Sequence, residues 1–263
     1  MRGLSTGNAG MYPTGAGVPG EATEILSVVV NIVVGLVTSV ISGGCVWLWQ
    51  RGKHARVLSR KAAFFGIRPG GECLIVMNHK YDRPGSAAHR DVQAMVEVAT
   101  LASELNSQVT VEASGTFQES NDDRTEFCIG GPWSGSNSRT AGHLAAHLPG
   151  VSWLPFGSGP DSSAILVGGN RFLWDRGNEE YALVAKFTPL ESTCPVFLVC
   201  GQSSLANHAA VHFLKRAHTQ VARAVPSTDR FAVVVRISSI ATYGFQRADF
   251  ERDVSAAAFA APV

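Results

Sequence analysis

The hydrophobic pattern begins with one long apolar stretch and then changes to short, mixed elements. Residues 25–50 contain no charged side chain in 26 positions, and valine, isoleucine and leucine supply most of them. At a rise of about 1.5 Å per residue, this stretch can cross a hydrocarbon core of roughly 30 Å. We therefore predict one transmembrane helix over residues 25–50. The glycine-rich residues 1–24 are expected to be a disordered tail.

Charges beside the apolar stretch predict its orientation. Only Arg2 precedes it, together with Glu21 and Glu24, whereas five Lys and Arg residues follow within residues 51–61. The positive-inside rule then places the C-terminal domain in the cytoplasm and the N-terminus outside, as in a single-pass protein of the cell membrane. A cleaved signal peptide is the rival interpretation, but no basic cluster precedes the stretch and no small-residue cleavage site follows it. Residues 51–71 read as a basic juxtamembrane stalk and linker.

Small side chains recur every four residues along the predicted helix, at Asn31, Gly35, Ser39 and Gly43. Small residues at this spacing let two helix backbones approach closely, and an asparagine can hydrogen-bond across the contact. The stripe therefore predicts a helix–helix contact in a homo-oligomer. A valine-rich anchor with tolerated small residues needs no partner, and a pore assembled from several copies is a further alternative.

After residue 71 the pattern alternates strands with helices. Apolar runs predict strands over residues 73–77, 108–113, 126–129, 164–167, 181–187, 196–200 and 230–237. Helical spacing of apolar residues predicts helices over residues 91–105, 139–148 and 207–225. Such alternation is typical of parallel strands covered by helices on both faces. We expect an α/β fold: a Rossmann-like three-layer domain with a mainly parallel sheet over residues 72–245, and a C-terminal tail over residues 246–263.

Composition narrows the class of protein. Charged residues are 16% of the chain, hydrophobic residues 45%, and the formal net charge is +1. These values fit a membrane segment with a well-filled core, and they argue against a dedicated nucleic-acid binder. The five cysteines form no CxxC pair, so we expect buried thiols in a reducing compartment. A nucleophilic Cys200 at a strand end is the alternative.

Three loops follow predicted parallel strands, and ligands of open α/β sheets bind beyond the carboxyl ends of such strands. The loops are residues 78–90 (NHKYDRPGSAAHR), 130–139 (GGPWSGSNSR) and 201–208 (GQSSLANH). From them we select nine candidate ligand-binding residues: Lys80, Asp82, Arg83, Gly130, Gly131, Ser134, Ser136, Asn137 and Gly201.

The chemistry of these loops suits a small anion such as a nucleotide. Glycine lets backbone N–H groups approach an anion, and the following helix N-terminus adds partial positive charge. Lys80 and Arg83 would add full charges. A tight Gly-Gly-Pro turn followed by a capped helix would give the same pattern without a ligand, and the charged loop could simply be solvated.

Metal and catalytic patterns are weak. His143 and His147 have i, i+4 spacing, but the glutamate of an HExxH motif is missing, so no metal site is predicted. No predicted strand leads into a GxSxG elbow, and no cofactor can be named. An enzyme acting on a nucleotide or glycosidic bond would need a nucleophile or base at the same loops, with His79, Asp82 and Cys200 as candidates.

The strand–GGPxxxxN–helix unit, the Tyr-Ala-Leu-Val run at residues 181–184 and the segment VFLVCGQSSLANHAAVHFL together carry a resemblance. Over roughly residues 72–243 the chain resembles a group of actinobacterial proteins of uncharacterised activity. These carry a Rossmann-like domain behind a varied N-terminal module. The resemblance implies this fold and the sensing of a nucleotide-like ligand by a bacterial signalling protein. The enzyme and the membrane-perturbing oligomer stay open beside this sensor hypothesis.

Overall fold

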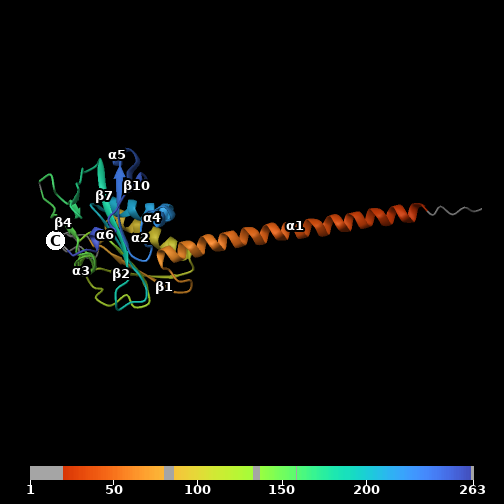
Figure 1. Cartoon of the computed structure of the whole chain (residues 1–263), viewed down its shortest axis with the longest axis horizontal. Coiled ribbons are helices and arrows are strands. Elements are labelled where there is room, and N and C mark those ends of the chain that lie inside the picture. The colour runs from red at the N-terminus through yellow and green to blue at the C-terminus, as the bar shows by residue number, and fades with distance from the viewer. Residues whose placement is uncertain (1–19, 80–85, 133–136, 158, 262–263) are drawn as a thin grey trace, which may run out of the picture. The chain divides into compact units, whose positions relative to one another are not determined.

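The computed structural model describes residues 20–79, 86–132, 137–157 and 159–261 (Figure 1). Its strands are β1 (Glu72–Met77), β2 (Gln108–Ala113), β3 (Thr125–Ile129), β4 (Val151–Trp153), β5 (Ile165–Val167), β6 (Asn170–Phe172), β7 (Glu179–Phe187), β8 (Val196–Gly201), β9 (Phe231–Ser238) and β10 (Ala248–Asp253). Its helices are α1 (Gly20–Phe65), α2 (His89–Glu104), α3 (Ser138–His147), α4 (Ser204–Ala224), α5 (Ile240–Tyr243), the 3-10 helix η2 (Gly244–Gln246) and α6 (Ser255–Ala258).

Helix α1 contains the predicted membrane segment. Its portion Glu24–Phe65 is long and apolar enough to cross a membrane, judged by length and composition. Large apolar side chains are exposed along this part of the helix, among them Ile25, Leu36 and Trp49. A polar-faced helix of a soluble protein would not expose such a surface. The prediction of one long apolar helix near the N-terminus is therefore confirmed, while its orientation stays a prediction.

The chain forms two compact units, residues 1–56 and 57–263. The last turns of α1 belong to the second unit, where Phe64 and Phe65 are 5% and 1% exposed. Residues 57–71, expected to be stalk and linker, thus belong to the same compact unit as the sheet, and Ala62, Phe64, Phe65 and Ile67 are buried in its core. Gly66 ends the helix at φ +63°, and a side chain there would place its Cβ 2.3 Å from Cγ of Pro195. Only glycine fits this turn.

The core of the second unit is a seven-stranded sheet in the order β10-β9-β7-β8-β3-β1-β2. The pairs β1–β2, β1–β3 and β3–β8 are parallel, and β7–β8, β7–β9 and β9–β10 are antiparallel. Strands β7 and β10 therefore run against the other five. The structure confirms an α/β fold with a mostly parallel sheet.

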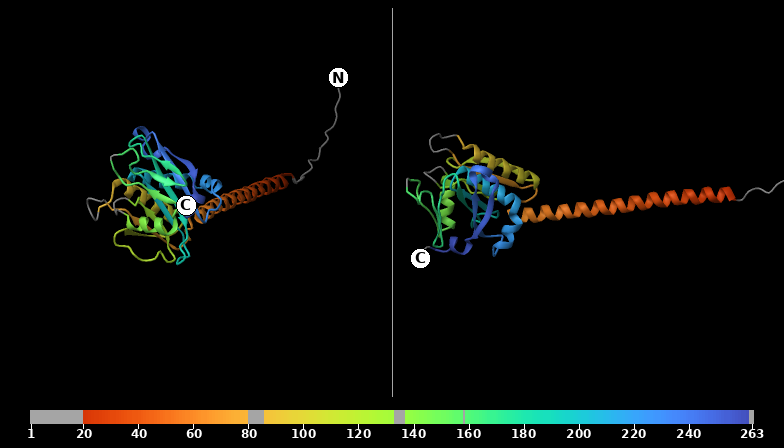
Figure 2. Two further views of the ribbon diagram at one scale, coloured as in Figure 1. Left: turned by 60° about the vertical axis from the view of Figure 1, so that its left-hand side comes forward. Right: turned by 90° about the horizontal axis from the view of Figure 1, so that it is seen from above.

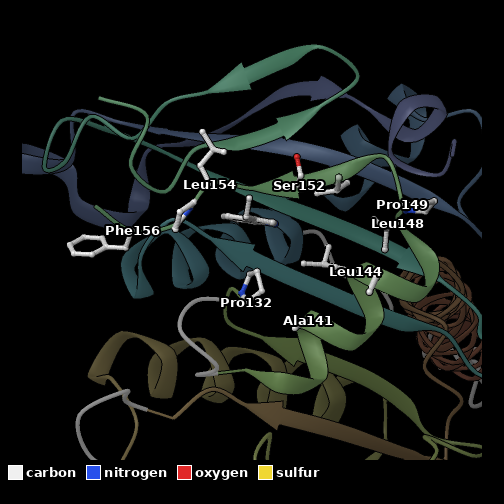
Figure 3. A pocket seen from close by; sticks show the side chains of 12 residues that line it. Pro132, Ala141, Leu144, Leu148, Pro149, Ser152, Leu154 and Phe156 are labelled. Atoms are coloured by element: carbon white, nitrogen blue, oxygen red, sulfur yellow. The ribbon is translucent and has the colours of Figure 1, made fainter. Parts of the chain in front are cut away.

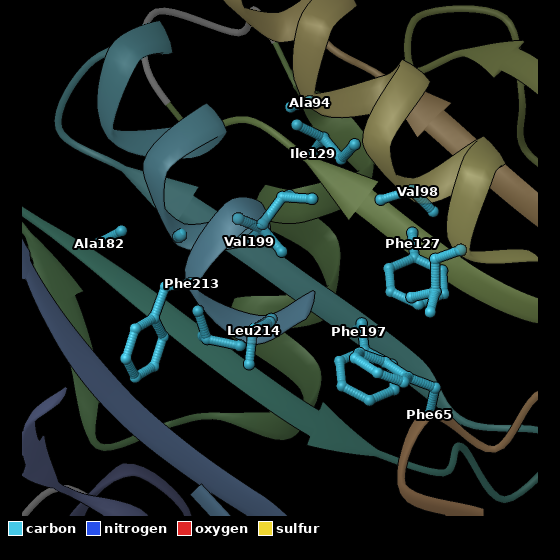
Figure 4. Close-up of a cluster of buried hydrophobic side chains, with 14 of the residues drawn as sticks. Phe65, Ala94, Val98, Phe127, Ile129, Ala182, Phe197, Val199, Phe213 and Leu214 are labelled. Atoms are coloured by element: carbon cyan, nitrogen blue, oxygen red, sulfur yellow. The ribbon is translucent and has the colours of Figure 1, made fainter. Parts of the chain in front are cut away.

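Both faces of the sheet are covered (Figures 1 and 2). On one face, Ile75 and Val199 belong to an apolar cluster with α2, α4 and the end of α1. On the other, Leu74 and Leu198 pack with α3, α6 and the three-stranded sheet β4-β5-β6. Neighbouring strand residues alternate between the two clusters because side chains alternate across a strand. Figure 4 shows the centre of the first cluster, where Phe65, Phe127 and Phe197 lie together.

Residues 246–263, expected to be a tail, instead contain β10 and α6. Strand β10 pairs antiparallel with β9 and has a register shift between Phe250 and Arg252. Its sequence ADFERD is polar because the strand forms the sheet edge and is only partly buried. The short strands β4 and β6 were also not predicted, since three residues are too few to show a period.

Candidate functional site

The candidate site lies where the chain connections diverge, between the carboxyl ends of β1 and β3. Strand β1 leads through α2 to β2, which lies on one side of β1. Strand β3 lies on its other side and leads into α3, which covers the opposite face of the sheet. Connections that leave in opposite directions open a crevice at this point, and ligands of open α/β sheets bind there.

Gly130 packs tightly against the end of β1 at this point. Its φ is +119°, and a Cβ built on it would lie 2.6 Å from Cβ of Asn78. Backbone strain and overlap both exclude a side chain here. The glycine lets the first residue after β1 and the first residue after β3 pack directly against each other. Gly131, which follows, is also buried.

A buried polar network surrounds the same point. Asp91 of α2 is 1% exposed and accepts a hydrogen bond of 2.8 Å from Nδ2 of Asn207 in α4. The side chain of Asn78 also hydrogen-bonds to this carboxylate. The Oδ1 of Asn207 accepts a bond of 2.6 Å from the backbone N–H of Gly201. The network therefore links the loops that follow β1 and β8.

Burial strongly affects the charge of Asp91. Removal from water raises the pKa of this carboxyl to about 6, against the hydrogen bonds from Asn207 and Asn78, which lower it. The carboxyl is therefore half-protonated near pH 6. A titratable group with this environment, placed at a crevice, is a recognised feature of functional sites.

Asn78 has one unsatisfied atom. Its Oδ1 is buried and has no hydrogen-bond partner among the described residues. The side chain lines a hollow of about 420 Å³ at the ends of β1 and β2. The hollow is lined by Met77, Asn78, His79, Ser86, Ala87, Val111, Glu112, Ala113, Gly115 and Thr116. An unpaired buried acceptor is costly, so a donor from a bound molecule would stabilise this wall.

Asn137 positions the start of α3. Its Oδ1 accepts a hydrogen bond of 2.9 Å from the backbone N–H of Thr140, and its Nδ2 donates to the carbonyl of Ile129 at 3.0 Å. The Oγ1 of Thr140 in turn donates to the carbonyl of Gly130 at 2.9 Å. The Asn137 side chain thus caps α3 and fixes the start of the glycine loop, the loop that begins with Gly130 and Gly131 after β3.

A buried ion cluster fixes α3 to β3. Glu126 is fully buried and accepts two hydrogen bonds from Arg139, at 2.9 and 2.7 Å. Nε2 of His143 lies 3.1 Å from Oε1 of Glu126. Burial alone would raise the pKa of Glu126, but the bonds from Arg139 and His143 outweigh it and hold that pKa below its ordinary value.

The two histidines of α3 have structural contacts. His143 belongs to the Glu126 cluster, and the His147 ring lies 4.5 Å from that of Phe187. Within the described part of the chain, no group of three or more His, Cys, Asp and Glu side chains is arranged to hold a metal ion. Cys200 is fully buried, and its burial raises the pKa of the thiol well above the ordinary value. It therefore lacks the thiolate character of a nucleophile.

The nine predicted ligand-binding residues divide into two groups. Gly130, Gly131, Asn137 and Gly201 lie at the carboxyl edge of the parallel strands. The remaining five lie outside the described residues: Lys80, Asp82, Arg83, Ser134 and Ser136. Sequence reasoning did not select Asn78 or Asn207. Asn78 directly follows β1, and Asn207 lies in the first turn of α4 at this edge. These positions in the sequence were the signal that could have identified them.

The predicted helix-contact residues Asn31, Gly35, Ser39 and Gly43 are exposed on α1. The hydroxyl of Ser39 donates to the carbonyl of Gly35 at 2.8 Å, so it is satisfied within its own helix. A side chain added at Gly35 or Gly43 would meet no described atom within 4 Å. Both glycines therefore expose the helix backbone, which no side chain covers at these positions.

No protein-family model, curated protein or solved structure matches this chain. The site must therefore be interpreted from its own geometry.

Proposed function

We propose that this chain is a single-pass membrane protein whose cytoplasmic domain binds a small, anionic, nucleotide-like ligand and acts as a sensor or signalling module. The ligand would bind at the carboxyl ends of β1 and its neighbours β2 and β3, as ligands do in Rossmann-like domains. The single observation that carries the proposal is the buried, unpaired Oδ1 of Asn78, a residue that packs against Gly130 and lines a hollow of about 420 Å³.

The unpaired oxygen indicates the kind of group it would bind. An amide oxygen accepts hydrogen bonds, so the partner is a donor such as a sugar hydroxyl. The same ligand can direct an anionic group toward the start of α3, where backbone N–H groups carry partial positive charge. Lys80 and Arg83 are the basic residues that we expect to complete the anion site.

The membrane part of the proposal rests on α1. Its apolar portion is followed by five basic residues within residues 51–61, which favours a cytoplasmic domain and an outside N-terminus. The exposed Gly35, Ser39 and Gly43 support self-association of this helix in the lipid bilayer. Nothing in the charge balance supports a nucleic-acid partner.

The proposal can be tested with the full chain in nanodiscs of phosphatidylcholine and phosphatidylglycerol. Binding of a radiolabelled nucleotide panel is measured by equilibrium dialysis. We expect at least one nucleotide to bind, and Asn78→Ala to weaken it by about tenfold or more, because the Asn78 side chain no longer reaches the ligand.

Asn121→Ala is the matched control. Asn121 is also a buried asparagine, but its Nδ2 donates to the carbonyls of Arg124 and Cys194 at the opposite edge of the sheet. Its loss should lower stability and leave nucleotide affinity unchanged. The proposed function is excluded if no nucleotide of the panel binds the wild-type chain.

A further inference from the structure

A second, larger cavity lies beside the candidate site, between α3 and the strand β4 with the loop that follows it (Figure 3). Its volume is about 700 Å³, within the range of small-molecule sites. Twelve residues line it: Pro132, Ala141, Leu144, Ala145, Leu148, Pro149, Val151, Ser152, Trp153, Leu154, Pro155 and Phe156.

The walls of this cavity are apolar. None of the twelve described lining residues carries a charge, and the serine and the indole N–H supply the polar side-chain groups. Leu144 and Leu148 form a buried wall, with exposures of 7% and 0%, whereas Phe156 is 64% exposed. The cavity therefore suits a neutral group that gains by leaving water.

One residue connects the cavity to the candidate site. Pro132 lines the cavity and directly follows Gly130 and Gly131 in the loop after β3. In Figure 3 the side chain of Pro132 lies across the cavity from that of Leu154. A ligand whose anionic group binds at the start of α3 can thus place a neutral group along the face of α3 that carries Ala141 and Ala145.

We propose that this cavity takes the planar heteroaromatic ring of the ligand, that is, the base of a nucleotide. The inference rests on the proposed function and deepens it. Trp153 offers an aromatic face, and nucleotide bases stack on aromatic side chains whichever base they are. A ring has one polar edge, and the hydroxyl of Ser152 and backbone groups at the cavity can satisfy that edge.

The experiment fills the cavity from the wall of α3. Ala145 lines the cavity and Ala146 does not, and both are exposed residues of the same helix. Leucine is a good helix former, so Ala145→Leu and Ala146→Leu should fold equally well. Affinities for AMP, GMP and ribose 5-phosphate are measured for the full chain in the same nanodiscs, together with the unfolding midpoint of each variant.

We expect wild type to bind AMP or GMP about tenfold or more tightly than ribose 5-phosphate, because only the nucleotides carry a ring. Ala145→Leu should remove this advantage and leave ribose 5-phosphate affinity unchanged. Ala146→Leu should change neither affinity. Equal unfolding midpoints would show that Ala145→Leu acts through binding and not through a loss of stability.

Each other result overturns the inference in a distinguishable way. If AMP and GMP bind equally to wild type and Ala145→Leu, the ring lies elsewhere and the proposed function stands. If Ala145→Leu weakens ribose 5-phosphate as much as AMP, the cavity does not recognise the ring. If no nucleotide binds, the proposed function is lost. The cavity is then tested with adenosine and guanosine, and absence of their binding excludes a ring site.

Discussion

The two edges of the parallel strands differ in how completely their groups are packed and paired. At the amino edge, Nζ of Lys186 donates to the carbonyl of Phe64 at 2.7 Å, and Oγ1 of Thr125 donates to that of Gly66 at 2.7 Å. Both carbonyls belong to the end of α1, where helix carbonyls lack partners within the helix. Phenylalanine rings fill the space beneath them, with Phe127 and Phe197 stacked at 4.9 Å.

At the carboxyl edge the packing is incomplete. A hollow of about 420 Å³ and a cavity of about 700 Å³ lie on the two sides of the glycine loop. The Oδ1 of Asn78 is buried without a partner in the described residues, and Asp91 is buried with a raised pKa. The packed amino edge stabilises the fold, and the less completely packed carboxyl edge is where we propose the ligand site. Departures from full packing and pairing are expected at functional sites.

The largest test of this contrast concerns the end of α1. Phe65→Ala removes a ring that is 1% exposed and packs against Phe197 at 5.6 Å between ring centroids. We expect a loss of about 3–5 kcal/mol in the free energy of unfolding, as for other buried phenylalanines. Urea denaturation of the full chain in nanodiscs, followed by near-UV circular dichroism, gives the value.

Val57→Ala is the control for that substitution. Val57 lies on the same helix and is 57% exposed, so its truncation should change stability by less than about 0.5 kcal/mol. Similar small effects for Phe65→Ala would mean that the end of α1 is a linker after all.

The second test uses the charge of Lys186. This side chain is 3% exposed, and burial lowers its pKa from 10.5 to about 8, although nearby Asp229 raises it. Below pH 8 both folded and unfolded states hold the proton, and the buried charge costs about 3 kcal/mol. Between pH 8 and 10.5 the folded state loses its proton first. Stability should therefore rise with pH in this window, and Lys186→Met should abolish the rise.

The third test concerns Asp91 and gives the opposite pH dependence. Burial raises the pKa of Asp91 from 3.8 to about 6, so the folded state binds a proton before the unfolded state as pH falls. Stability should rise by roughly 3 kcal/mol between pH 6 and 3.8, measured against Asp91→Asn at each pH. Identical pH profiles of the variant and wild type in this window would contradict the buried position of this carboxyl.

The smallest test compares two glycines beside α3. Gly130→Ala should cost roughly 1–3 kcal/mol because φ is +119° and its Cβ would overlap Asn78. Gly142→Ala meets no atom within 4 Å in a regular helix, so it should stabilise by about 0.5–1 kcal/mol. Thermal unfolding of both variants checks the sign. An increase in stability for Gly130→Ala would contradict the tight contact between Gly130 and Asn78.

The central strands could be predicted from sequence because burial on both faces leaves a continuous apolar run. The run CLIVM contains five buried residues of β1, and VFLVC contains most of β8. Strand β10 could not be predicted in this way, since its polar sequence reflects an edge position that only the fold creates. The role of α1 in the core was also hidden, because Phe64 and Phe65 follow a run of basic residues that is typical of a stalk.

Loop position predicted part of the candidate site. Gly130 and Gly201 were selected because glycines after parallel strands commonly approach ligands. Asn78, Asp91 and Asn207 belong to three separate segments, and their hydrogen bonds depend on how α2 and α4 pack. No local sequence pattern predicts that these three side chains lie together. Lys186 gave no signal either, since a lysine near a strand end normally reaches solvent.

The turn at Gly66 has a consequence for sequence variation. A Cβ at this position would lie 2.3 Å from Pro195, a residue far away in the chain that directly precedes β8. In homologues that keep this packing, position 66 should remain glycine, because a φ of +63° strains any other residue whatever stands at position 195. Position 195 can change to a smaller residue while position 66 stays glycine. An invariant glycine beside a variable residue 195 would mark the end of α1 through evolution.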